Sequence, residues 1–191
     1  MEPDEKILLH VCCAPCSCEI IEGMLFTGLR PTLYFYNPNI HPQDEYDIRK
    51  NEVIRFAASH GIPFVDADYD TDHWFARVKG LEQEPERGRR CSACFAFRME
   101  RTALYAHENG FRTFATSLSI SRHKNQSRVH QAGEDATIHY ADLRFWAYNW
   151  RQRGGSDRGA HIAKTEGFYR QNYCGCVFSR RDRAAFQKQR G

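Results

Sequence analysis

ILLHVCCAPC, residues 7–16, is the stretch that decides the fold of this chain. Its apolar first half is typical of a buried strand, and it ends abruptly in Cys12 and Cys13. Pro15 then suits the first turn of a helix, and apolar residues recur at helical spacing as far as Gly28. A buried strand that runs directly into a helix is the opening unit of an α/β fold.

The same alternation continues along the rest of the chain. Apolar and β-branched segments predict further strands at residues 32–36, 62–65, 111–116 and 137–140. Helical periodicity and end signals predict helices at residues 44–60, 72–79, 91–109, 125–135 and 160–170. We therefore expect an α/β fold with a mainly parallel, Rossmann-like (HUP-like) sheet and helices on both faces. Ligands of such sheets bind beyond the carboxyl ends of the strands, so we expect a metal site there, at Cys12 and Cys13.

The composition indicates a water-soluble domain. A chain of 191 residues is long enough for one core, and we expect a single α/β domain over residues 1–191. With 41% hydrophobic and 27% charged residues, it fits neither the disordered nor the membrane class. The acidic start, residues 1–6, lacks the apolar stretch and cleavage site of a secretory signal. We therefore expect a cytoplasmic protein with no membrane partner.

Positive charge is concentrated near the C-terminus. Residues 144–191 carry eleven Lys or Arg against three Asp or Glu, whereas the preceding residues sum to −5. Most of these cations are Arg, which binds phosphate in a bidentate fork. The aromatic residues of the segment suit stacking on bases; they are Phe145, Trp146, Tyr148 and Trp150. We expect residues 144–191 to fold back to the site and to meet RNA, although a solvated helical face would also explain the charges.

Seven of the eight cysteines fall into three groups: Cys12, Cys13 and Cys16; Cys91 and Cys94; Cys174 and Cys176. A disulfide framework is not expected in a reducing cytoplasm, so metal or redox chemistry is the leading interpretation. A Cys-x-x-Cys at the start of a helix, as at Cys91 and Cys94, favours thiolates. Two more thiolates from the end of the first strand would complete four sulfur ligands, the number that iron-sulfur clusters and structural zinc both take.

Several alternatives stay open at this point. The cysteines could be inert and buried, or they could hold structural zinc in an RNA-binding module without turnover. Residues 13–16 also fit a thioredoxin-like dithiol site, but the other cysteines would then be unexplained. A nucleotide-activating enzyme is disfavoured, because cysteines follow the first strand where a Gly-rich phosphate loop would be expected. More than four thiols favour redox work, and Cys174 with Cys176 would form a strained, easily reduced ring if oxidised.

Over roughly residues 8–178 the sequence resembles the cobalamin-independent epoxyqueuosine reductases. The motifs that carry the resemblance are HVCCAP (10–15), YFYNPNIHP (34–42), Glu45-Tyr46 with Arg49, WF (74–75), VKGLE (78–82), EPERG (84–88), Arg90-Cys91 with Cys94, Arg98, TA (102–103), TSL (116–118), Ser121, Lys124 and YRQNYCGC (169–176).

The resemblance implies a reaction and a set of site residues. The reaction is reductive removal of the epoxide oxygen from epoxyqueuosine at the wobble position of a tRNA anticodon loop, which consumes two electrons and two protons. Ligands of a [4Fe-4S] cluster map onto Cys12, Cys13, Cys91 and Cys94, and Cys174 with Cys176 maps onto a redox-active disulfide. Cys16 would join Cys12 or Cys176 at an additional mononuclear iron. The implied partners are the tRNA and an electron-donor protein such as a ferredoxin or a flavodoxin.

An opening epoxide needs a proton donor or a cation beside its oxygen. The candidates in the motif segments are His41, Glu45, Tyr46, Arg49, Lys124 and Tyr173. Each has an ordinary alternative role. Glu45 and Arg49, four apart on a predicted helix, would pair with each other. His41 would only shape its loop, Tyr173 would belong to the core, and Lys124 would bind phosphate.

Overall fold

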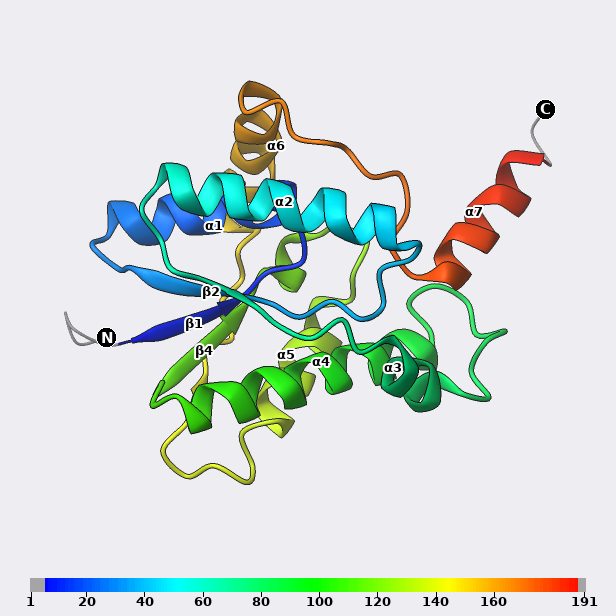
Figure 1. The fold of residues 1–191 in the computed structure, drawn as a ribbon, viewed down its shortest axis with the longest axis horizontal. Coiled ribbons are helices and arrows are strands. Elements are labelled where there is room, and N and C mark those ends of the chain that lie inside the picture. The colour runs from blue at the N-terminus through cyan, green and yellow to red at the C-terminus, as the bar shows by residue number, and fades with distance from the viewer. Residues whose placement is uncertain (1–5, 189–191) are drawn as a thin grey trace.

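The computed structural model describes residues 6–188 and contains a five-stranded sheet between two layers of helices (Figure 1). The strands are β1 (Ile7–His10), β2 (Pro31–Phe35), β3 (Phe64–Asp66), β4 (Thr113–Thr116) and β5 (Arg144–Phe145). Their order is β3-β2-β1-β4-β5, and every neighbouring pair is parallel. The predicted Rossmann-like α/β fold is confirmed.

Helices cover both faces of the sheet (Figure 1). The α-helices are α1 (Ala14–Phe26), α2 (Gln43–Ser59), α3 (Thr71–Val78), α4 (Arg89–Glu108), α5 (Gln126–Asp135), α6 (Gly155–Thr165) and α7 (Val177–Lys188). Two 3-10 helices are η1 (Ser117–Ile120) and η2 (Gln152–Gly154). Helices α1, α2 and α6 lie on one side, and α3, α4 and α5 lie on the other. Within residues 6–188, no helix is long and apolar enough to cross a bilayer.

Strand β1 is buried on both faces, which explains its unbroken apolar run. Ile7 and Leu9 pack in the core that includes Phe56 of α2, whereas Leu8 packs in the core that includes Met99 of α4. The central strands end level with one another, because His10 is in register with residues 34 and 116 on its two neighbours. The segments that follow β1, β2 and β4 therefore meet at one edge of the sheet.

The strand predicted at residues 137–140 is wrong. There the chain continues the last turn of α5, with the Ile138 N–H donating to the Asp135 carbonyl at 3.2 Å, and the Ile138 side chain is 72% exposed. The fifth strand is instead the two-residue β5, paired with β4. β-branched side chains favour a strand mainly where they can be buried. Residues 137–140 are not buried, so they form a turn after the end of α5 and not a strand.

Two helices also differ from prediction. The helix expected at residues 160–170 lies at residues 155–165. Gly155 and Gly159 have low helix propensity, so the sequence gives no helix signal at its start. Helix α7 was not predicted, since its only buried residue is Ser179 and it has no apolar stripe of the usual width.

Candidate metal centre

Three sulfur atoms gather where β1 passes into α1. Cys12 and Cys13 follow the strand, and Cys16 lies in the first turn of the helix. The three Sγ atoms all lie within 4.8 Å of one another, and those of Cys12 and Cys13 are 3.7 Å apart. Cys12 and Cys13 are buried, whereas Cys16 is half-buried. The expected cysteine group at the carboxyl ends of the strands is therefore confirmed, and its three sulfur atoms are close enough to hold one metal ion.

The three thiols differ in acidity. Thiol donors on Cys13 and Cys16 lower the pKa of Cys12 well below its usual value. Burial and the hydrogen bond with Cys12 raise the pKa of Cys13 to about 12, and hydrogen bonds with both neighbours raise the pKa of Cys16. The group therefore accepts one negative charge readily and resists three. Three thiolates in this space require a compensating cation, which is what a bound metal supplies.

A second sulfur group lies at the start of α4. Cys91 and Cys94, together with Cys174 and Cys176 from the C-terminal segment, line a cavity of about 20 Å³. Burial raises the pKa of Cys91 to about 11 and that of Cys176 to about 12. All eight cysteines are free thiols in the structure, so the predicted bond between Cys174 and Cys176 is not present.

Buried nitrogen donors surround this second group. The Nε atoms of Arg90 and Arg98 are buried and form no hydrogen bond among residues 6–188. Burial raises the pKa of Cys94, while the Arg98 charge and the Trp74 indole N–H act in the opposite direction. Unsatisfied buried donors are costly, and an anionic sulfur-rich group would satisfy them. The residues therefore fit an iron-sulfur cluster.

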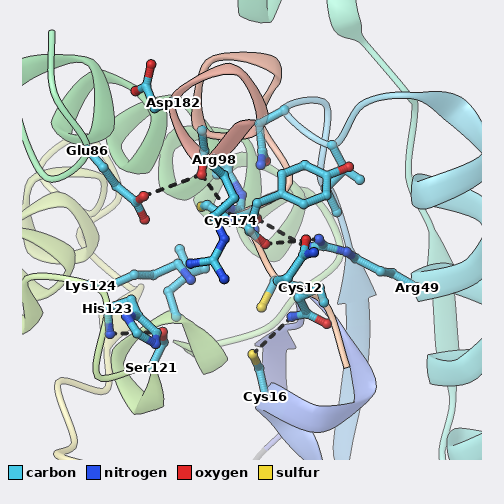
Figure 2. Close-up of a pocket in the computed structure, with 18 of the residues that line it drawn as sticks. Cys12, Cys16, Arg49, Glu86, Arg98, Ser121, His123, Lys124, Cys174 and Asp182 are labelled. Carbon is cyan, nitrogen blue, oxygen red and sulfur yellow. Dashed lines mark hydrogen bonds between the residues drawn. The ribbon is translucent and has the colours of Figure 1, made fainter. Parts of the chain in front are cut away.

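A larger cavity of about 430 Å³ joins the two sulfur groups. Cys12 and Cys16 line it from the first group and Cys174 from the second, with Lys124 on the opposite side (Figure 2). Burial alone would lower the pKa of Lys124, but the nearby Cys174, Cys12 and Cys16 sulfurs raise it. Lys124 therefore carries a positive charge between the two groups at neutral pH.

Two arginines fix the loop that carries Lys124. The Arg87 Nε donates to the His123 carbonyl at 2.9 Å, and the Arg151 Nη2 donates to the Lys124 carbonyl at the same distance. Because guanidinium groups hold its carbonyl oxygens, the loop stays at the mouth of the large cavity.

Glu45 and Arg49 of α2 hold the C-terminal cysteines in place. The Arg49 Nε donates to Glu45 at 2.8 Å, and its two Nη atoms donate to the carbonyls of Tyr173 and Cys174 at 3.3 and 3.1 Å. Gly175 has φ +113°, and a Cβ there would lie 2.9 Å from the Arg49 Nη1. Only glycine allows this close approach. The expected pair exists, and its arginine also anchors the segment that carries Cys174.

Of the other predicted proton donors, Tyr173 lines the larger cavity, whereas His41, Glu45 and Tyr46 line neither cavity. The His41 ring packs beside Trp74 and Phe75, and burial lowers its pKa. Tyr46 is buried against Tyr69, with ring centroids 4.0 Å apart. His41 and Tyr173 are joined through the backbone, because the Tyr173 hydroxyl donates to the His41 carbonyl at 2.6 Å. The roles predicted for His41, Glu45 and Tyr46 stay predictions.

Sequence reasoning missed Gln171, although it belongs to the YRQNYCGC motif. Its Nε2 donates to the Cys13 Sγ at 3.1 Å and lies 3.9 Å from the Cys16 Sγ. Position in a motif was the available signal. The direction in which the amide points depends on how the C-terminal segment folds back, which no local pattern encodes.

The chain is similar to a set of known proteins. A model of the family described as epoxyqueuosine reductase QueH matches residues 7–182. Epoxyqueuosine reductase QueH of Acinetobacter baylyi is 55% identical over 187 residues, which cover 98% of this chain and 86% of that protein. The Thermotoga maritima protein of the same name is 35% identical over 192 residues, and the match covers 97% of each chain.

A solved structure has a similar fold. It is the U34-tRNA thiolase NcsA from Methanococcus maripaludis with its [4Fe-4S] cluster, which superposes with a TM-score of 0.54 at 10% sequence identity. The match covers 97% of this chain and 66% of that one. At this identity the similarity shows the fold alone.

Proposed function

The chain belongs to the epoxyqueuosine reductase QueH family and is therefore an oxidoreductase of queuosine biosynthesis, and we propose how its residues carry out the reaction. The substrate is tRNA with epoxyqueuosine at the wobble position, and the products are queuosine and water. Both carbon–oxygen bonds of the epoxide break, a carbon–carbon double bond forms, and the oxygen leaves with two protons. The observation that carries the proposal is the pair of sulfur groups, which both reach the larger cavity, one through Cys12 and Cys16 and the other through Cys174.

The cofactor is a [4Fe-4S] cluster held by Cys12, Cys13, Cys91 and Cys94. Free thiols at the strand ends and buried donors around Cys94 support this set, and a protein of similar fold is known with such a cluster. When bound, the cluster supplies electrons one at a time. Cys16, together with Cys12 or Cys176, would hold an additional mononuclear iron.

Lys124 stands where the departing oxygen needs a proton or a positive charge. Its raised pKa keeps Nζ protonated, and it lines the same cavity as Cys12 and Cys174. A protonated amine beside a developing alkoxide stabilises it and can pass it a proton. Cys174 and Cys176 would act as a redox pair, since two thiols that become a disulfide release two electrons and two protons.

The remaining expectations describe the setting of the reaction. We expect a cytoplasmic enzyme of one α/β domain, with residues 144–191 completing the site. An electron-donor protein, such as a ferredoxin or a flavodoxin, would return electrons after each turnover. Residues 171–186 supply part of the wall of the large cavity, which supports the role of the C-terminal segment.

Replacement of Cys91 by alanine tests the proposal. Protein purified without air should be brown, with broad absorption near roughly 400 nm. Cys91→Ala should lose this absorption, most of its iron and epoxide reduction together. Cys18→Ala is the matched control, because its Sγ contacts backbone carbonyls of Pro15 and Gly159 and belongs to neither sulfur group.

Two outcomes would contradict the proposal. Wild-type protein that is colourless and holds only zinc would support the RNA-binding module without turnover. Full activity and iron in Cys91→Ala would refute the ligand set. The same assays on Cys16→Ala separate the two metals, since it should keep the cluster absorption and lose only iron in excess of four per chain.

A further inference from the structure

Helix α7 stands away from the body of the molecule (Figure 1). Its first turn is anchored, because Phe178 packs against Trp74 with ring centroids 6.0 Å apart and Ser179 is buried. From Arg180 to Lys188 every side chain is exposed except the half-buried Asp182. A helix of 12 residues is marginal in water when nothing packs on it. From its second turn on, α7 therefore exposes most of its side-chain surface to solvent.

The exposed part of α7 is strongly basic. Four cations, at residues 180, 181, 183 and 188, face one acidic residue, Asp182. Arg181 pairs with Asp182 at 2.8 Å, and the buried Arg90 lies 3.7 Å from the same carboxylate. Arg180 and Arg183 form no ion pair with residues 6–188, so their charges are available to a partner. Such a surface fits a polyanion.

The helix also forms one wall of the large cavity. Asp182, Arg183 and Phe186 line it together with Cys12 and Lys124. Figure 2 shows Asp182 at the rim of this hollow, beyond Glu86 and Arg98. A nucleotide whose base enters the cavity must leave its phosphates at this mouth, beside α7.

We propose that α7 is an arm that binds the RNA backbone on either side of the modified nucleotide. This inference rests on the proposed function. Arginine suits phosphate because its planar fork donates two parallel hydrogen bonds. RNA is favoured over an acidic protein, since the substrate's own phosphates pass α7 on the way to the cavity, whereas an electron donor has no need to approach there.

The salt dependence of RNA binding tests the arm. The probe is an anticodon stem-loop RNA with epoxyqueuosine, titrated against the iron-loaded protein at several salt concentrations. In Arg180→Gln/Arg183→Gln, the slope of log affinity against log salt should become shallower by about 1.4 to 1.8, because each phosphate contact contributes roughly 0.7 to 0.9. The double variant with lysine at both positions should keep most of the wild-type slope, which separates lost charge from misfolding.

Arg30→Gln/Arg112→Gln is the matched control. Both residues are exposed, and they precede β2 and β4, at the edge of the sheet opposite the site. This variant removes the same charge and should keep the wild-type slope. Equal slopes for the α7 variant and wild type would overturn the inference. So would unchanged RNA binding combined with slower reduction by an acidic electron-donor protein, which would assign the arm to that partner.

The binding slopes do not depend on turnover. Wild-type protein without iron or epoxide reduction would refute the proposed function, whereas a slope unaffected by the α7 substitutions would refute only the arm.

Discussion

Single side chains set the electrical environment of the sulfur atoms. Gln171 is the clearest case, because its amide is the one non-cysteine side chain within 4 Å that donates to Cys13 among residues 6–188. Hydrogen bonds to ligand sulfurs stabilise the more negative, reduced state of a cluster. A residue far along the chain thus acts directly on the first sulfur group.

Removal of this donor should make the proposed cluster harder to reduce. For Gln171→Leu we expect a shift of the reduction potential to more negative values by roughly 40 mV, which corresponds to one hydrogen bond of about 1 kcal/mol. A spectroscopic redox titration measures the shift. Asn172→Leu is the control, since Asn172 lines the same cavity without a hydrogen bond to sulfur. Equal potentials in the two variants would show that the Gln171 contact has no electronic effect.

His10 at the end of β1 predicts a loss of stability in acid. Burial and the charge of Arg98 lower the pKa of His10 from 6.5 to about 3. The unfolded chain binds a proton as the pH falls below 6.5, and the folded chain does not until about pH 3. The stability contributed by neutral His10 is therefore complete above pH 6.5 and is lost between these values, by roughly 1.4 kcal/mol per pH unit.

Urea unfolding of the iron-free protein at several pH values measures this slope. His10→Gln should be less stable at pH 7, because His10 is buried and bonded to Thr116 at 2.8 Å. Its stability should nevertheless fall less steeply than that of the wild type between pH 6.5 and 4. Parallel curves would place the acid sensitivity in other groups.

At the scale of elements, α2 acts as the support of the C-terminal segment. The Arg49 side chain is 2% exposed and spans Glu45 and two backbone carbonyls of that segment. On the same helix, Arg55 pairs with Glu166, but its side chain is 53% exposed. One helix therefore carries a buried and an exposed ion pair, which makes an internal comparison possible.

The two pairs should differ in their contribution to stability. Arg49→Met leaves the buried Glu45 carboxylate with the Tyr169 hydroxyl but without its cation, and it leaves two backbone carbonyls without their guanidinium donor. It should lower the free energy of unfolding by about 3 kcal/mol or more. Arg55→Met should lower it by less than about 1 kcal/mol, because exposed pairs contribute little. Chemical denaturation measures both. Similar losses would mean that the buried position of Arg49 has no special importance.

The elements that could be predicted are those with a strong local signal. β1 and α1 follow from an apolar run, a proline and helical spacing, and α4 follows from its length and from Gly110 after its end. β5 could not be predicted, since two residues form a strand only because β4 offers them an edge. α7 lacks an apolar stripe, so its sequence resembles a polar tail. The sulfur-bearing residues were found by spacing, whereas Gln171 and Arg49 depend on contacts between distant segments.

At the scale of the whole molecule, the proposed metal ligands come from regions that are far apart in the chain. Cys12 and Cys13 follow the first strand, Cys91 and Cys94 begin α4, and the chain between them forms α1, β2, α2, β3 and α3. A ligand that binds only the folded state raises its stability by mass action. Iron should therefore stabilise the fold as a unit.

Thermal unfolding under anaerobic conditions tests this coupling. The iron-loaded wild type should melt several degrees above the iron-free protein, since about 1 kcal/mol shifts the midpoint of a chain of this size by roughly 2 to 4 °C. Cys18→Ala should keep this difference, and Cys91→Ala should lose it. A midpoint independent of iron would show that the metal does not bind the folded chain tightly.

The strand order explains why a cavity lies beside the ends of β1 and β4. From β1 the chain first builds outward through β2 to β3 on one flank, and then returns to place β4 and β5 on the other. The connections after β1 and β4 consequently leave in opposite directions and part from each other, as in other doubly wound sheets. The crevice thus arises from the strand order, and side chains along its walls can be substituted without closing it.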